Sequence, residues 1–182
     1  TAMGIVTADV GFGGLAGTTN IIMRASKYAQ GGRVSYAAAN RSYTGRIMGT
    51  YNSGESPSGW AYSTSLSRRF AEEAFIDGTL YDANALFVSV EKRINSFHSL
   101  NFTGFYNPNI RGKSSSNTQE VYDLKGLRNN SILGLQNDQI RNSRVREIRD
   151  TVFILNHFWK PAYTLEVNTH VAYQCGMMGN SR

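Results

Sequence analysis

The stretch LEVNTHVAY, residues 165–173, decides the fold class of this chain. Successive side chains of a β-strand point to opposite faces of the sheet, so a strand sorts its residues with a period of two. Here one face would carry apolar or β-branched side chains and the other would carry polar or small ones. The first face comprises Leu165, Val167, Thr169, Val171 and Tyr173, and the second comprises Glu166, Asn168, His170, Ala172 and Gln174. One face therefore suits lipid or a protein core, and the other suits water.

The same alternation recurs along the chain and predicts about seven strands. Their expected ranges are 33–40, 43–52, 60–68, 84–94, 98–107, 151–160 and 163–175. Hairpin-type connections join them in order, so sequential strands should pair side by side and antiparallel. The predicted fold class is therefore all-β, an antiparallel meander. The strand at 151–160 is apolar on both faces, which leaves its register open.

The connections between these strands are short at one end of the predicted sheet and mostly long at the other. The short ones lie near 53–59, 95–98 and 161–163, and the long ones are 68–82 and 107–150, the last without any sustained period. Residues 40–42 form a short turn on the long side. Short turns on one side and long loops on the other are typical of a transmembrane β-barrel. A soluble β-sandwich shows the same strand period, so it remains an alternative.

Composition narrows the class of protein further. The chain has 182 residues, 41% of them hydrophobic, and a net charge of +6. Cys175 is the single cysteine, which rules out an internal disulfide. No apolar run approaches the ~20 residues of a membrane-spanning helix, which excludes a helical membrane protein. The basic residues are scattered over loops and polar strand faces, so a nucleic-acid partner is not predicted.

Motifs for catalysis, cofactors or metal ions are absent from the sequence. The glycine-rich segment 11–17 fits no phosphate-binding fingerprint and is not followed by the required lysine. His98, His157 and His170 stand far apart in sequence, whereas a zinc site needs three or four converging ligands. No nucleophile motif is present. The sequence predicts neither an enzyme nor a bound cofactor or metal.

Four charged or titratable residues lie on polar strand faces and are the candidates for a functional surface. They are Arg46, Glu91, Glu166 and His170. In a barrel these side chains would point into the lumen, where they would line the path of a solute or bond to whatever fills the lumen. The basic segment 141–149 is predicted to be a solvated loop, with contact to a lipopolysaccharide or an anionic ligand as the alternative.

Many short motifs resemble, in order, the TonB-dependent outer-membrane receptors of Bacteroidota. The segment GGLAGTTNI at 13–21 looks like the last part of the plug domain of that family. Further matching motifs are RAS at 24–26, RVSY at 33–36, NRSY at 40–43, SRR at 67–69, GTLYD at 78–82, SVEKR at 89–93, HSLNFT at 98–103, ILNH at 154–157 and GNSR at 179–182. The resemblance covers nearly the whole chain.

The resemblance implies a domain organisation and a function. Residues 1–31 would be the C-terminal end of a plug domain, and 32–182 the first strands of a barrel that has ~22 strands in the family. The chain would then be a fragment of a receptor in the bacterial outer membrane. Such receptors take up a nutrient, for example a siderophore, glycan or peptide, by energised gating of the plugged barrel.

The resemblance also implies partners. These are the lipid of the outer membrane, the nutrient itself, and the TonB complex, which would engage an N-terminal segment outside this sequence. A surface lipoprotein is a further partner that the resemblance allows. The alternative function, a soluble or secreted β-sandwich that acts as a binding or adhesin module, requires none of these membrane partners.

Overall fold

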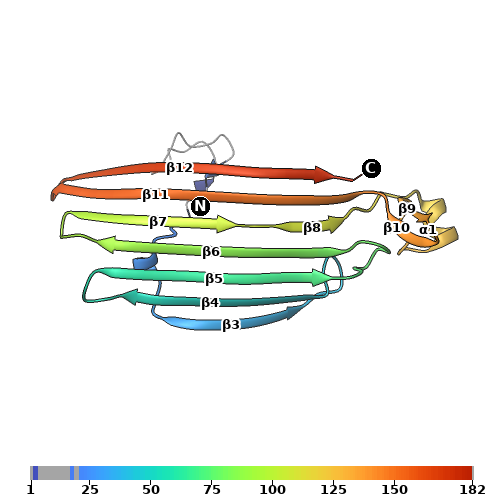
Figure 1. Cartoon of the computed structure of the whole chain (residues 1–182), viewed down its shortest axis with the longest axis horizontal. Coiled ribbons are helices and arrows are strands. Elements are labelled where there is room, and N and C mark those ends of the chain that lie inside the picture. Colours follow the sequence, from blue (N-terminus) through green and yellow to red (C-terminus); the bar gives the residue numbers. More distant parts are fainter. Residues whose placement is uncertain (1, 4–16, 19–20, 182) are drawn as a thin grey trace.

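The computed structural model describes residues 2–3, 17–18 and 21–181, and one antiparallel sheet of eight strands dominates it (Figure 1). The strands of this sheet are β3 (Gly31–Ala38), β4 (Gly45–Glu55), β5 (Trp60–Ala71), β6 (Tyr81–Arg93), β7 (His98–Tyr106), β8 (Asn109–Gly112), β11 (Val145–Ala162) and β12 (Leu165–Asn180). They lie in the order β12-β11-β7-β6-β5-β4-β3, and β8 continues the line of β7 between β6 and β11. The seven predicted strands and their antiparallel meander are therefore confirmed.

The remaining described elements are small. Strands β1 (Ala2–Met3) and β2 (Gly17–Thr18) pair with each other, and a 3-10 helix, η1, spans Ala25–Lys27. Helix α1 (Gln119–Lys125) precedes a hairpin of β9 (Leu133–Gln136) and β10 (Gln139–Asn142). No helix in the described part of the chain is long and apolar enough to cross a membrane.

The prediction that 107–150 lacks regular structure is wrong. This stretch contains β8, α1, β9, β10 and the first residues of β11, so the predicted loop at 141–149 lies mostly in two strands. The strands β8 to β10 have only four residues each, too few to display a period of two. Buried Asn130 and Asn142, rather than an apolar core, tie this connection together, because both donate to backbone carbonyls.

The pairing register sorts the side chains of the large sheet onto two faces. Cross-strand partners point to the same side, so the strands share one apolar face, which we define by its large apolar members. These members are Val34, Tyr36, Ile47, Tyr51, Trp60, Tyr62, Leu66, Leu86, Val88, Val90, Leu100, Phe102, Phe153, Leu155, Trp159, Val167, Val171 and Tyr173. The opposite side is the polar face.

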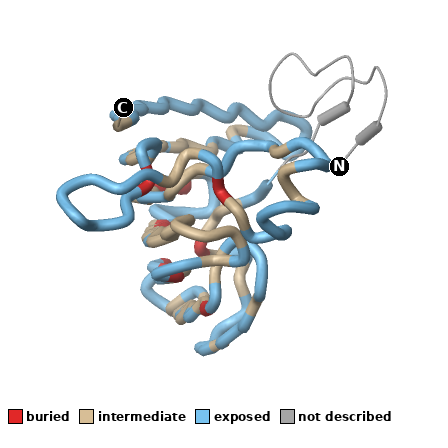
Figure 2. Tube along the Cα trace, turned by 90° about the vertical axis from the view of Figure 1, so that its right-hand side faces the viewer, coloured by how far each residue is buried: buried red, intermediate tan, exposed pale blue. Residues whose placement is uncertain are grey.

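Burial in this sheet is inverted relative to a soluble protein. The buried apolar residues among those described are three alanines, Ala25, Ala61 and Ala71, whereas eight polar or charged residues are buried. On the apolar face, Leu66 is 60% exposed and Val171 is 62% exposed. Figure 2 shows how sparse the buried positions are along the chain. Within the described residues no second large sheet covers the apolar face, as a β-sandwich would require.

The structure also resolves the register of the strand that is apolar on both sides. Phe153, Leu155 and Trp159 of β11 lie on the apolar face with Phe102 and Val167. The alternate residues lie on the polar face, where Ile154 and Phe158 line a hollow together with Ile21, Ile22 and Met23. On the polar face of the sheet, β11 therefore carries apolar side chains because the N-terminal segment lies against them.

Candidate functional site

The candidate site begins with a row of cross-strand partners on the polar face. Ala61 of β5, Glu91 of β6, Asn101 of β7, Asn156 of β11 and His170 of β12 are successive register partners. Strand alternation places all five side chains on the same side of the sheet. The row therefore runs across five strands near the end that carries the short turns.

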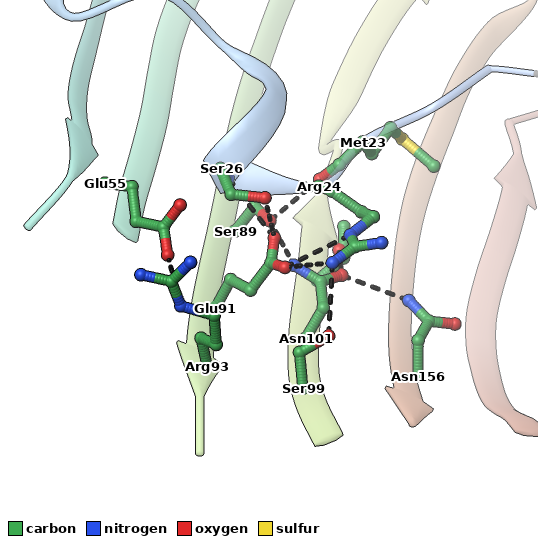
Figure 3. A network of polar contacts seen from close by, with 11 residues as sticks. Met23, Arg24, Ser26, Glu55, Ser89, Glu91, Arg93, Ser99, Asn101 and Asn156 are labelled. Atoms are coloured by element: carbon green, nitrogen blue, oxygen red, sulfur yellow. Dashed lines mark hydrogen bonds and ion pairs between the residues drawn. The ribbon is translucent and has the colours of Figure 1, made fainter. Parts of the chain in front are cut away.

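The segment that precedes β3 crosses this row and bonds to its one carboxylate (Figure 3). The guanidinium of Arg24 forms an ion pair with Glu91, in which Nε lies 3.1 Å from Oε1. Ser26 donates to the other carboxylate oxygen, from its hydroxyl at 2.8 Å and from its backbone N–H at 3.2 Å. Both oxygens of Glu91 are thus satisfied by residues 24–26, which lie more than 60 residues away in sequence.

Neighbouring polar side chains extend the network. Ser89 donates to the carbonyl oxygen of Met23 at 2.8 Å and accepts from the Asn101 amide at 2.9 Å. The Asn156 side-chain amide donates to the side-chain oxygen of Asn101 at 3.0 Å. His170 Nδ1 lies 2.8 Å from the side-chain oxygen of Asn156. We call residues 23–26, with Ser89, Glu91, Asn101, Asn156 and His170, the latch.

The electrostatics of the latch favour a closed arrangement. Glu91 is only 3% exposed, so its charge depends on the partners that the N-terminal segment supplies. Arg24 also donates to the Ser99 hydroxyl at 3.1 Å, and its guanidinium carbon lies 3.9 Å from the centre of the Phe158 ring. Removing the segment would break the ion pair of Glu91 and the hydrogen bonds that Ser89 and Ser99 form with it, all at the same time, which is costly. The latch therefore holds residues 21–30 on the polar face.

This arrangement is suited to holding and releasing a segment. Its members offer an ion pair and hydrogen bonds, including the bond from the Ser26 hydroxyl to the Glu91 carboxylate. Within the described residues no group of three or more His, Cys, Asp or Glu side chains converges as a metal site. His98 and His157, far apart in sequence, are nevertheless neighbours on the apolar face, with Nδ1 and Nε2 3.0 Å apart.

The four predicted site residues occupy three different places. Glu91 and His170 both belong to the latch, and Glu91 is covered by residues 24–26. Glu166 instead pairs with Lys160 at 3.0 Å beside the β11–β12 turn, where both side chains are exposed. Arg46 lies on the polar face toward the long loops, where its guanidinium contacts the Met48 sulfur at 3.2 Å. The sequence pattern thus predicted the strand face on which these four residues lie, but it did not predict which of them are neighbours.

The latch residues that sequence reasoning missed are Arg24, Ser26, Ser89, Asn101 and Asn156. Arg24 and Ser26 stand in an irregular segment, where no strand period indicates a face. The other three alternate correctly with Glu91 and His170, so their place on the polar face was predictable. Their mutual contacts depend on the pairing register, which the sequence does not specify.

No family model, no curated protein and no solved structure matches this chain. Its function is therefore inferred from the faces of the sheet and from the latch.

Proposed function

We propose that this chain is part of a TonB-dependent outer-membrane receptor, comprising the end of its plug domain and the first strands of its barrel. In this proposal the apolar face meets lipid and the polar face lines the lumen. The nutrient is a siderophore, a glycan, a peptide or a similar solute, and its passage depends on energised movement of the plug.

The inverted burial of the sheet is the observation that carries the proposal. A contiguous face of large aliphatic and aromatic side chains is more than a soluble monomer normally leaves in water. An outward apolar band and a polar interior are the expected pattern of a barrel wall. Among the described residues, the largest side chains that are fully buried are instead polar, namely Asn101, Thr103 and Ser89.

Two aromatic clusters near the short turns support a membrane boundary at that level. Trp60 and Tyr62 stack with ring centres 6.0 Å apart, and the Lys92 ammonium lies 4.8 Å from the Trp60 ring. Trp159 stacks on His98 at 5.8 Å on the same face. Tryptophan, tyrosine and lysine are the side chains that favour a bilayer interface.

The latch supports the assignment of residues 21–30 to the end of a plug. A segment held on the lumen face by one buried ion pair and several hydrogen bonds can be released as a unit when those bonds break. The free energy needed is several kcal/mol, on the order of a broken buried pair, which mechanical coupling to an energised complex would supply.

The proposal predicts where the chain resides and what it cannot do alone. In cells that express its gene, the chain should fractionate with the outer membrane, and uptake of one nutrient should depend on the gene and on the proton-motive force. Within the described residues β3 and β12 each have an unpaired edge, so this sheet encloses no lumen. The 182-residue chain in liposomes should therefore give no saturable solute flux. Saturable flux, or recovery as a monodisperse water-soluble protein, would contradict the proposal.

A further inference from the structure

A second feature lies at the other end of the sheet, where a hollow opens between three connections. Its volume is about 290 Å³, and it is lined by the turn at 40–44, the loop at 72–80 and residues 111–114 at the end of β8. Three cations line it, namely Arg41, Arg111 and Lys113, together with the hydroxyl side chains of Tyr81, Ser42 and Ser114. None of the described residues that line this hollow carries a carboxylate.

The cations that line the hollow lie close to further cations. Arg111 and Arg146 are direct register partners, and Arg144 accepts a backbone hydrogen bond from Lys113 at 2.9 Å. None of these four cations forms an ion pair within the described residues. The pKa of Lys113 lies below its ordinary value because the ammonium is partly desolvated and because Arg146, Arg144 and Arg111 repel its charge.

The backbone at the hollow is held in place by buried side chains. The carbonyl of Lys113 accepts from Asn142 at 2.8 Å and from Asn130 at 3.1 Å, and both amides are almost fully buried. Gly112 leaves no room for a side chain, because an added Cβ would lie 2.7 Å from the carbonyl oxygen of Gly78. The cations are therefore presented from a fixed scaffold, which lowers the entropic cost of binding.

A second pair of arginines continues the positive surface on the polar face. Arg46 and Arg69 are register partners on β4 and β5, and the Nε atom of each is buried without a hydrogen-bond partner in the described part of the chain. Arg69 lies 5.8 Å from the ring of Tyr43, which in turn packs 6.1 Å from Tyr81 of the hollow. Like charges placed directly opposite each other destabilise a sheet, so a bound anion would relieve this pair.

We propose that this hollow binds an oxyanion, the phosphate or a comparable acidic group of a small solute. Arginine and lysine side chains bind phosphate through charge-assisted hydrogen bonds, and the hydroxyl groups supply further donors. The site is separate from the latch, and it would bind an anion whether or not the sheet is part of a barrel wall.

Pyrophosphate, titrated into the 182-residue chain in neutral detergent micelles and followed by calorimetry, tests this site. Saturable binding is expected, and added salt should weaken it. The double variant Arg111→Gln/Lys113→Gln should lose about tenfold or more in affinity. The matched control Arg33→Gln/Lys125→Gln removes the same charge from exposed positions outside the hollow and should bind as the parent does.

One further variant and one further ligand test the same site. Arg41→Gln changes an exposed turn residue outside the strands, and it should weaken binding several-fold even where the double variant folds poorly. Phosphatidic acid mixed into the micelles distinguishes a lipid headgroup from a free solute as the source of the oxyanion, and binding of either supports the site. Failure of both to bind saturably, or equal loss in the control variant, would overturn the proposal.

Discussion

The two faces of the large sheet obey opposite rules although they come from the same strands. On the apolar face, large side chains such as Leu66 and Val171 are mostly exposed. In the part of the chain that the structure describes, no second layer covers that face. On the polar face, small polar side chains and one carboxylate are buried beneath the N-terminal segment. This sheet is therefore organised around polar contacts on one side, and on the other side its apolar side chains are left uncovered by the described residues.

The first prediction removes the charge at the centre of the polar face. Glu91→Ala leaves Arg24 beside the sheet without its carboxylate, and removing one partner of a buried pair typically costs ~3–5 kcal/mol. We expect the lower part of that range in free energy of unfolding, because the Arg24 side chain remains 23% exposed. Urea unfolding in detergent measures the loss, and trypsin should cleave after Lys27 faster than in the parent.

The control for this change is Glu55→Ala, which breaks the more exposed pair between Glu55 and Arg93. That pair should contribute within ~1 kcal/mol, and cleavage after Lys27 should not change. Equal effects of the two substitutions would mean that the latch does not hold the N-terminal segment.

The second prediction places a charge on the apolar face. Val88→Arg should impair insertion into a bilayer by ~2–4 kcal/mol if Val88 lies near the midplane. Ser67→Arg, on the polar face of the adjacent strand, is the matched control and should insert nearly as the parent does. Partitioning between vesicles and denaturant measures both variants. If Val88→Arg inserts as efficiently as Ser67→Arg, the apolar face is not the face that contacts lipid.

The third prediction tests the hydrogen bonds of the latch without changing its charge. Asn101 is buried, donates to Ser89 and accepts from Asn156 and Thr103. Asn101→Ala leaves these neighbours without their partner, so unfolding free energy should fall by ~1–3 kcal/mol. A change indistinguishable from zero would indicate that water replaces the amide and that the row across the sheet adds little rigidity.

The smallest effect is expected at the exposed end of the polar face. Glu166→Gln removes the ion pair with Lys160, in which both side chains are well exposed. We expect no measurable change in thermal unfolding, since exposed pairs are screened by water and salt. A clear loss of stability would assign Glu166 a partner beyond Lys160.

Sequence reasoning predicted the faces well because strand alternation is a local property. The seven strands and the polar side of Glu91 and His170 follow from a period of two, and the order of the strands follows from the hairpin-type connections between them. The latch could not be predicted from this period, because Arg24 and Ser26 belong to an irregular segment whose path across the sheet brings them to Glu91. The connection at 107–150 was missed for a related reason, since its order comes from buried Asn130 and Asn142 rather than from apolar periodicity.

Fluorescence quenching by brominated lipids tests the central claim most directly, because Trp60 and Trp159 both lie on the apolar face and are 38% and 39% exposed. The chain is reconstituted into bilayers that carry bromine at defined acyl-chain depths. We predict strong quenching of both tryptophans, greatest for bromine near the headgroups, as their position beside the short turns requires. Absence of quenching at every depth, with full quenching by a water-soluble agent, would contradict a lipid-facing apolar surface.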